Sequence, residues 1–340
     1  MDNTVPIDDL DDGFFGLSAQ PEQSVSDLPA DVADANKKAY FTLLSVFQKL
    51  CIDLKSEGKA DGNELKNQID TIIALLQEDE RMLLGLANAP YSYVRRNIEE
   101  KLYGPIVIHG VNTMLYSLKI SIDLGVPAIR LPYIAAAAIC HRLGLLNLPD
   151  DHLIESGNTA EFDRNPQAAS DLINHITIDD FHIESIQYLI TLVGEDQQLL
   201  RKTSLREAMY QYSMVIHLCS EFETLTHQPA FGNALSPVDA MKKMRDEMKD
   251  YFHPDIIKLF FNKLSIYPLG SFVKLSSNET AKIVKVNENF IIRPEVMIVL
   301  DSEGREKLKP VRINLREKPN LYIKKAVIND YLTEKYIDLF

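Results

Sequence analysis

The chain has 340 residues, a formal net charge of -13 and an apolar fraction of 46%. This length and composition predict two or three domains with a sizeable buried core. The negative charge argues against a partner that is a nucleic acid or an anionic membrane, because both repel it. The strongest apolar run, Tyr133 to Cys140, is far shorter than the ~20 residues of a membrane span, and the N-terminus lacks the layout of a signal peptide. We therefore expect no membrane insertion.

The cysteines are Cys51, Cys140 and Cys219. They are odd in number, widely spaced and placed inside apolar stretches, which predicts small buried hydrophobic residues rather than disulfides. This usage suits a reducing cytoplasm, where we expect the protein to be.

Residues 1–33 carry eight acidic residues and no Lys or Arg, which predicts a disordered acidic tail. Within it, the island "IDDLDDGFFGL" from Ile7 to Leu17 places apolar side chains among aspartates: Leu10, Phe14, Phe15 and Leu17. Two interpretations stay open. The aromatic residues are incidental in a solvated tail, or the island is a linear motif that docks in an apolar groove of a partner or of this protein itself.

Residues 34–103 predict an N-terminal helical module. The stretches "AYFTLLSVFQKLCIDLKSEG" and "GNELKNQIDTIIALLQEDERMLLGLANA" repeat apolar residues at intervals of three and four. Gly58 is a candidate helix end. We expect two or three amphipathic helices that pack together.

Residues 104–263 predict a second, more apolar helical domain. "IVIHGVNTMLYSLKISIDLGV" and "EAMYQYSMVIHLCSEFETLT" are expected helices, and "LPYIAAAAICHRLGLL" is apolar nearly all round, so it belongs in the core. "PVDAMKKMRDEMKDYFHPDIIKLFFNKL" completes the domain with two helices divided at His253–Pro254.

Residues 264–340 predict a small β-rich extension. "SFVKLS", "TAKIVKVN" and "EVMIVLD" are short β-branched runs bounded by turn residues, as in a small antiparallel sheet. "YIKKAVINDYLTEKYI" adds either a strand or a helix. The basic stretch "KPVRINLREKPNLYIKK" is either a solvated surface or a face for an acidic partner, including the chain's own acidic tail. The predicted fold class is thus mainly α with a C-terminal antiparallel β extension.

Five segments, in the same order, resemble the HD-GYP branch of the HD superfamily, which are bacterial cyclic-di-GMP phosphodiesterases. They are "HGVNTMLYSLKISIDLGVP", "AAAICHRLGLLNLPDDHL", "TAEFDRNPQAASDLI", "VIHLCSEFETLTHQPAF" and "IYPLGSFVKLSSNETAKIVKVN". The resemblance extends roughly from Leu83 to Asp301. It implies an HD-type helical bundle for residues 104–263 and a bacterial setting.

The resemblance also implies a cluster of divalent metals held by imidazoles and carboxylates. Position by position, two histidines are kept, at His109 and His141. The other ligand positions fall on residues that do not replace the family's ligands: Pro105, Arg142, Asn165 and Ser220, with Glu221 one step out of register. The lysine expected to contact the substrate phosphate falls on Leu145. The interval from Ile183 to Glu207 contains neither a histidine nor a "GYP" sequence.

These replacements predict a metal site that has been lost, with no metal and no cofactor. A guanidinium has no lone pair for a metal and adds positive charge at Arg142. We expect His109 and His141 to be core histidines, and Arg142 to pair with a buried acid, Glu221 or Asp150. His217 and Cys219 are two residues apart on one helix, so they do not form a zinc site. Four further histidines are expected at the surface: His152, His175, His182 and His227.

Three functions stay open. The first is a catalytically inactive, HD-GYP-like regulatory or scaffold protein. Its partner is an unidentified protein, and a homodimer with a second copy of this chain is an open alternative. The second is a receptor that binds cyclic-di-GMP without cutting it, which the lost phosphate contacts disfavour. The third is a phosphodiesterase with a rearranged metal site. The first predicts that the chain is not an enzyme.

Overall fold

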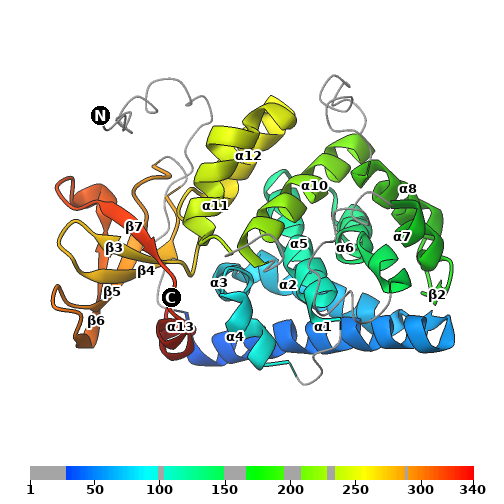
Figure 1. The fold of residues 1–340 in the computed structure, drawn as a ribbon, viewed down its shortest axis with the longest axis horizontal. Coiled ribbons are helices and arrows are strands. Elements are labelled where there is room, and N and C mark those ends of the chain that lie inside the picture. Colours follow the sequence, from blue (N-terminus) through cyan, green and yellow to red (C-terminus); the bar gives the residue numbers. More distant parts are fainter. Residues whose placement is uncertain (1–27, 99–102, 149–165, 195–207, 228–233, 288–289) are drawn as a thin grey trace.

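The computed structural model describes residues 28–98, 103–148, 166–194, 208–227, 234–287 and 290–340. It is mainly helical, with a small sheet on one side of the helical body (Figure 1). The predicted fold class is confirmed. The domain boundaries stay predictions, and the acidic tail up to residue 27 lies outside the described residues.

The N-terminal module begins with the long helix α1, Ala30–Glu57, which starts before the boundary expected at residue 34. It ends where predicted, because Gly58 has a left-handed backbone (φ 69°) and its N–H donates to the carbonyl of Leu54. Helices α2 (Asn63–Glu78), α3 (Arg81–Ala87) and α4 (Tyr91–Arg96) follow. The buried face of α2 carries the predicted apolar spacing: Leu65, Ile69, Ile72 and Leu76.

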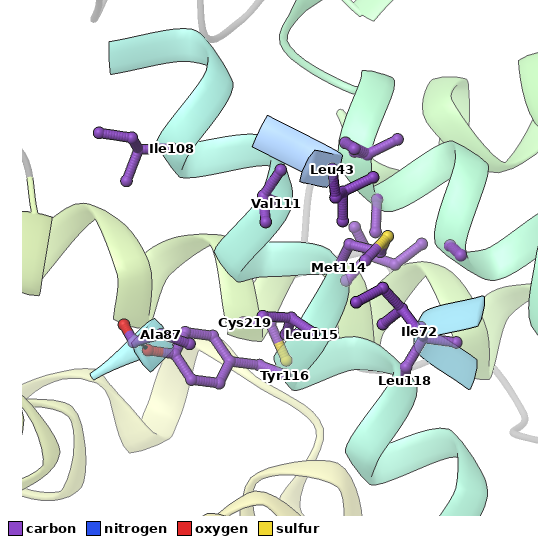
Figure 2. Packing of buried hydrophobic residues seen from close by; sticks show 14 of the residues in the cluster. Leu43, Ile72, Ala87, Ile108, Val111, Met114, Leu115, Tyr116, Leu118 and Cys219 are labelled. Atoms are coloured by element: carbon purple, nitrogen blue, oxygen red, sulfur yellow. Dashed lines mark hydrogen bonds between the residues drawn. The ribbon is translucent and has the colours of Figure 1, made fainter. Parts of the chain in front are cut away.

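The central helices surround α5, Gly104–Asp123, which is buried along almost its whole length. It packs on α6 (Leu131–Cys140) and α10 (Ala208–His227), and also contacts α1 and α2. Figure 2 shows Met114 and Leu115 of α5 in one cluster with Leu43 of α1, Ile72 of α2 and Cys219 of α10. Helix α6 is buried as its composition predicted.

Shorter elements complete the helical body. The described ones are η2 (Ala128–Arg130), η3 (Leu143–Asn147), α7 (Pro166–Ile173) and α8 (Ile183–Val193). Helices α11 (Pro237–Lys243) and α12 (Pro254–Leu264) are divided at the predicted place, where the His253 side chain accepts a hydrogen bond from the backbone N–H of Asp255. A π turn (η6, Met244–Met248) and a 3₁₀ turn (η7, Lys249–Tyr251) lie between them.

Two short strands join distant parts of the chain. β1 (Ala60–Asp61) pairs in parallel with β2 (Ile176–Thr177), with Ala60 opposite Ile176. The pair connects the N-terminal module to the segment between α7 and α8.

The C-terminal strands form an antiparallel sheet in the order β6-β5-β4-β3-β7. The predicted runs are β3 (Phe272–Leu275), β4 (Thr280–Lys285) and β5 (Glu295–Leu300), and β6 (Glu306–Asn314) was not predicted. The last stretch forms both a strand, β7 (Ile323–Val327), and a helix, α13 (Asp330–Tyr336). Helix α13 covers one sheet face, where Leu332 and Tyr336 pack against Phe272 and Val299.

A buried lysine joins the sheet to the end of α13 and the residues that follow it. The Nζ atom of Lys282, on β4, donates to the backbone carbonyls of Tyr336, Ile337 and Leu339 at 2.8–2.9 Å. It lies 3.5 Å from the ring centroid of Phe340. That ring in turn fills the space beside Gly85 of α3, where an added Cβ would lie 2.3 Å from the ring. The sheet, the C-terminal segment and the helical body are therefore packed as one unit.

One helical stretch, Ala128–Asn147, has the length and apolar composition of a membrane span, although the sequence predicted none. Its most apolar window is 72% buried inside the structure, as in a core helix of a soluble protein. The three cysteines are free and buried, which confirms the prediction for them.

Candidate functional site

The two retained histidines face each other in the helical core. His109 lies in the middle of α5, and His141 follows the last residue of α6. Their Nε2 atoms are 3.3 Å apart, and the Oγ atom of Ser220 on α10 lies 3.1 and 3.0 Å from them. The structure thus brings together three positions that the sequence resemblance identified: His109, His141 and Ser220.

Each imidazole is oriented through its other nitrogen. Nδ1 of His141 donates to the backbone carbonyl of Ala138 at 2.7 Å. Nδ1 of His109 contacts the carboxyl group of Glu223, on α10. An acceptor at Nδ1 fixes the ring and its tautomer, which leaves the Nε2 edge directed at the shared centre.

Burial favours the neutral forms of these groups. Desolvation lowers the pKa of His109 and of His141 well below the usual value, and the charge of Arg142 acts in the same direction. Desolvation also raises the pKa of Glu223, which is fully buried. At the centre, burial thus favours the neutral form of each of these groups beside the permanent charge of Arg142.

That charge is the guanidinium of Arg142. Its Nη2 atom donates to Oγ1 of Thr224 at 2.9 Å and lies 3.4 Å from Oγ of Ser220. These two bonds go to hydroxyl groups of α10. The predicted pairing of Arg142 with an acid, Glu221 or Asp150, stays a prediction. Asp150 lies outside the described residues. The fully buried acid near this charge is Glu223, whose pKa the positive charge of Arg142 lowers against the larger effect of burial.

Glu223 is a site residue that the sequence did not predict. Besides His109, it approaches His227, whose Nδ1 lies 3.5 Å from Oε1 of the carboxyl group. His227 is buried and its Nε2 bonds to the carbonyl of Ala89, so the prediction of a surface position was wrong for it. Helical spacing could have identified Glu223 from the sequence, because it is three residues after Ser220 and lies on the same helix face.

The other predicted positions are distributed as follows. Pro105 lies in the first turn of α5, one turn before His109. Leu145 is buried in η3. His175 and His182 are exposed, as predicted. Asn165, His152 and the island residues Leu10, Phe14, Phe15 and Leu17 lie outside the described residues.

The groups at the centre do not fit the bridged metal cluster that the resemblance implies. The donors directed at one point are two imidazole nitrogens and a hydroxyl, while the carboxyl of Glu223 lies at the opposite edge of the His109 ring. Arg142 adds a positive charge beside Ser220, which opposes a cation. Within the described residues, no group of three or more His, Cys, Asp or Glu side chains is placed to hold a metal ion. The prediction that no metal binds stays a prediction.

Comparison with known proteins supports the resemblance. Residues 272–335 match a family described as a KOW domain associated with HD domain. The chain is 20% identical over 248 residues to cyclic di-GMP phosphodiesterase PA4108 of Pseudomonas aeruginosa, which covers 70% of this chain and 58% of that protein. It is 21% identical over 192 residues to cyclic di-GMP phosphodiesterase PdeB of Borreliella burgdorferi, which covers 54% and 49%. No solved structure matches.

This chain therefore resembles the HD-superfamily cyclic-di-GMP phosphodiesterases, as its sequence segments indicated. It spans about half the length of the curated relatives that it matches. The expectation that the chain is not an enzyme is corrected by these matches, because both relatives are named as phosphodiesterases. The matches support the likeness to HD-GYP-type signalling proteins that the sequence segments indicated.

Proposed function

We propose that this chain is a regulatory protein of bacterial cyclic-di-GMP signalling, and that it passes its signal by contact with another protein in the cytoplasm. The observation that supports this is the mutual pairing of the side chains at the HD-derived centre. His109, His141, Ser220 and Glu223 bond to one another across α5, α6 and α10. The names of the relatives supply the signalling molecule.

The paired centre acts as a packing point for three helices. Its polar groups are desolvated, and a desolvated polar group stabilises a fold only when it is bonded. Because those bonds are made within the chain, we assign the contact with the partner to the protein surface. The island from Ile7 to Leu17 is the candidate segment for that contact, and a second copy of this chain is one candidate partner.

Binding of cyclic-di-GMP at the HD-derived centre is a second candidate function, favoured by Arg142. A guanidinium is the side chain best suited to bond a phosphodiester through two parallel N–H groups. Arg142 follows His141, which is partly exposed at the end of α6. A phosphate that reaches His141 would thus meet a permanent positive charge.

The two candidates are separated by replacing His141→Gln in the gene of the native bacterium. If the signal passes by surface contact, the variant restores the trait that is lost on gene deletion as well as the native chain does. Failure of the folded variant to restore it overturns this proposal and favours an event at the centre. The control is His175→Gln, which alters an exposed histidine away from the centre.

Calorimetry of the purified full chain with cyclic-di-GMP tests the second candidate. Binding by the native chain that is lost in Arg142→Leu supports it, and absence of heat at micromolar concentrations of both components contradicts it. Chromatography of the same samples measures hydrolysis, the activity stated by the names of the relatives.

A further inference from the structure

The C-terminal sheet has one edge that is open to a further strand. In the described sheet, β7 pairs only with β3, so its outer backbone groups face away from the sheet. Two exposed apolar side chains flank the strand, Tyr322 at 53% exposure and Ile328 at 57%. An edge strand with apolar neighbours is a template for pairing with an extended peptide.

Positive charge accumulates at this edge. Lys274 of β3 and Lys325 of β7 are directly opposite each other in the antiparallel register, an arrangement of like charges that is unfavourable. Among the described residues, neither lysine makes an ion pair with a carboxylate. The adjacent Lys324 bonds to the amide oxygen of Asn278 at 3.2 Å, which leaves its charge uncompensated by that contact. A peptide that brings carboxylates here would relieve the repulsion.

The opposite edge of the sheet differs. β6 contains Pro310, which cannot donate a backbone hydrogen bond to an added strand. Two of its three basic side chains are paired with acids, as Lys307 contacts Glu279 at 3.2 Å and Arg312 contacts Glu295 at 3.0 Å. The β7 edge is thus the one whose charge and backbone suit an acidic strand.

We propose that the acidic island of this chain, Ile7–Leu17, pairs with the β7 edge of its own C-terminal sheet. The island carries Asp8, Asp9, Asp11 and Asp12, and residues 1–27 contain no Lys or Arg. The aspartates oppose Lys274, Lys324 and Lys325, and Leu10, Phe14, Phe15 and Leu17 supply the apolar side chains for Tyr322 and Ile328. This inference is argued from the sheet edge and not from the proposed function, and an island paired with β7 cannot contact another protein at the same time.

The start of the described chain lies close enough to this edge. The backbone N–H of Leu28 donates to the carbonyl of Phe340 at 3.4 Å. The preceding residue, Leu339, packs in the same apolar cluster as Val327, the last residue of β7. An extended chain advances about 3.3 Å per residue, so the eleven residues from Leu17 to Leu28 reach up to about 36 Å. A five-residue strand is about 17 Å long, which this reach exceeds.

The tether also favours an occupant from the same chain over a free peptide. A short flexible connection raises the effective concentration of the island at the edge to about the millimolar range. Weak strand pairing combined with charge attraction is then sufficient for occupancy. The charge part of the attraction is expected to weaken with added salt.

Hydrogen exchange of the full chain tests the proposal, with the peptide that covers residues 322–328 as the readout. Replacing Asp8, Asp9, Asp11 and Asp12 by Asn removes the island's charge without altering a described residue. We expect exchange in this peptide to become at least about fivefold faster in that variant than in the native chain. A second variant, Phe14→Ser with Phe15→Ser, is expected to show the same direction of change.

The matched control replaces acidic residues of the tail outside the island: Asp2→Asn, Glu22→Gln and Asp27→Asn. It is expected to keep the native exchange rate at β7. Equal rates in the native and the island variants would overturn the proposal. Protection that rises with protein concentration would also overturn it, because the occupant would then be a second copy of the chain.

Discussion

The helical centre and the helix–sheet junction both bury a basic side chain, and they satisfy it in different ways. Arg142 donates to hydroxyl groups of α10 and lies near a buried acid, Glu223. Lys282 has three backbone carbonyls and the face of Phe340 as partners. A substitution can replace a side-chain partner, but it cannot remove a backbone carbonyl. We therefore expect position 282 to tolerate fewer substitutions than position 142.

The largest effect is expected for Lys282→Met. Methionine keeps the length of the side chain but leaves three buried carbonyls without their donor, and each unsatisfied group costs about 1–3 kcal/mol. Allowing for partial rearrangement, we expect a loss of about 3 kcal/mol or more in the free energy of unfolding, measured with urea. The control is Lys285→Met in the same strand, where a half-buried ion pair with Glu295 is worth at most about 1 kcal/mol. Equal losses in the two variants would contradict the assignment of Lys282.

A smaller loss is expected for Arg142→Leu. The hydroxyl of Thr224 keeps its own bond to the carbonyl of Ser220 at 2.8 Å after the guanidinium is removed. We therefore expect a loss of about 1.5–3 kcal/mol, the range of a hydrogen bond to a charged group. Thermal and urea unfolding measure it. Arg130→Leu, at an exposed position of η2, is the comparison and is expected to change stability by less than about 0.5 kcal/mol. Unchanged stability of Arg142→Leu would show that the guanidinium has no structural role.

The smallest effect is expected in the pH dependence of stability, through the two histidines of the helical centre. His109 and His141 have folded-state pKa values below their unfolded value of 6.5, so the unfolded chain binds more protons below that pH. The free energy of unfolding is then expected to fall as the pH drops from 7.5 to 5.5. Removing one of these groups by His141→Gln should make that fall about 1 kcal/mol smaller. His175→Gln, at the surface, should leave the fall unchanged, and an equal effect of both substitutions would argue against a lowered pKa of His141 in the folded chain.

Local pattern predicted most of the fold. Apolar spacing located α1 and α2, and β-branched runs located β3, β4 and β5, because each of these elements carries its own periodic signal. β6 was missed, since lysines alternate with apolar residues around Pro310 and this is the composition of a solvated loop as much as of an edge strand. Lys282 gave no sign of burial either. Its environment is made by carbonyls more than fifty residues later in the chain.

The candidate site was predicted in part. His109 and His141 were identified through the family resemblance, and the structure brings them together. Glu223 was missed because its contact with His109 joins residues 114 positions apart. The family resemblance pointed to Ser220 and Glu221. Glu223 is linked to Ser220 through the helical repeat, which places both on one face of α10. A pairwise contact of this kind is decided by packing of α5 on α10, which no local pattern encodes.

The parallel pair of β1 with β2 has a consequence for folding kinetics. The side chain of Ile178 packs against Gly62 so closely that a Cβ added to Gly62 would lie 2.6 Å from it. The N–H of Gly62 donates to the carbonyl of Thr177. This contact closes a loop of more than one hundred residues, and loop closure of that length slows folding more than it reduces stability. The turn before α2 therefore reaches its final state only after residues near 178 have been synthesised. During translation, α1 and α2 leave the ribosome well before the segment that completes them.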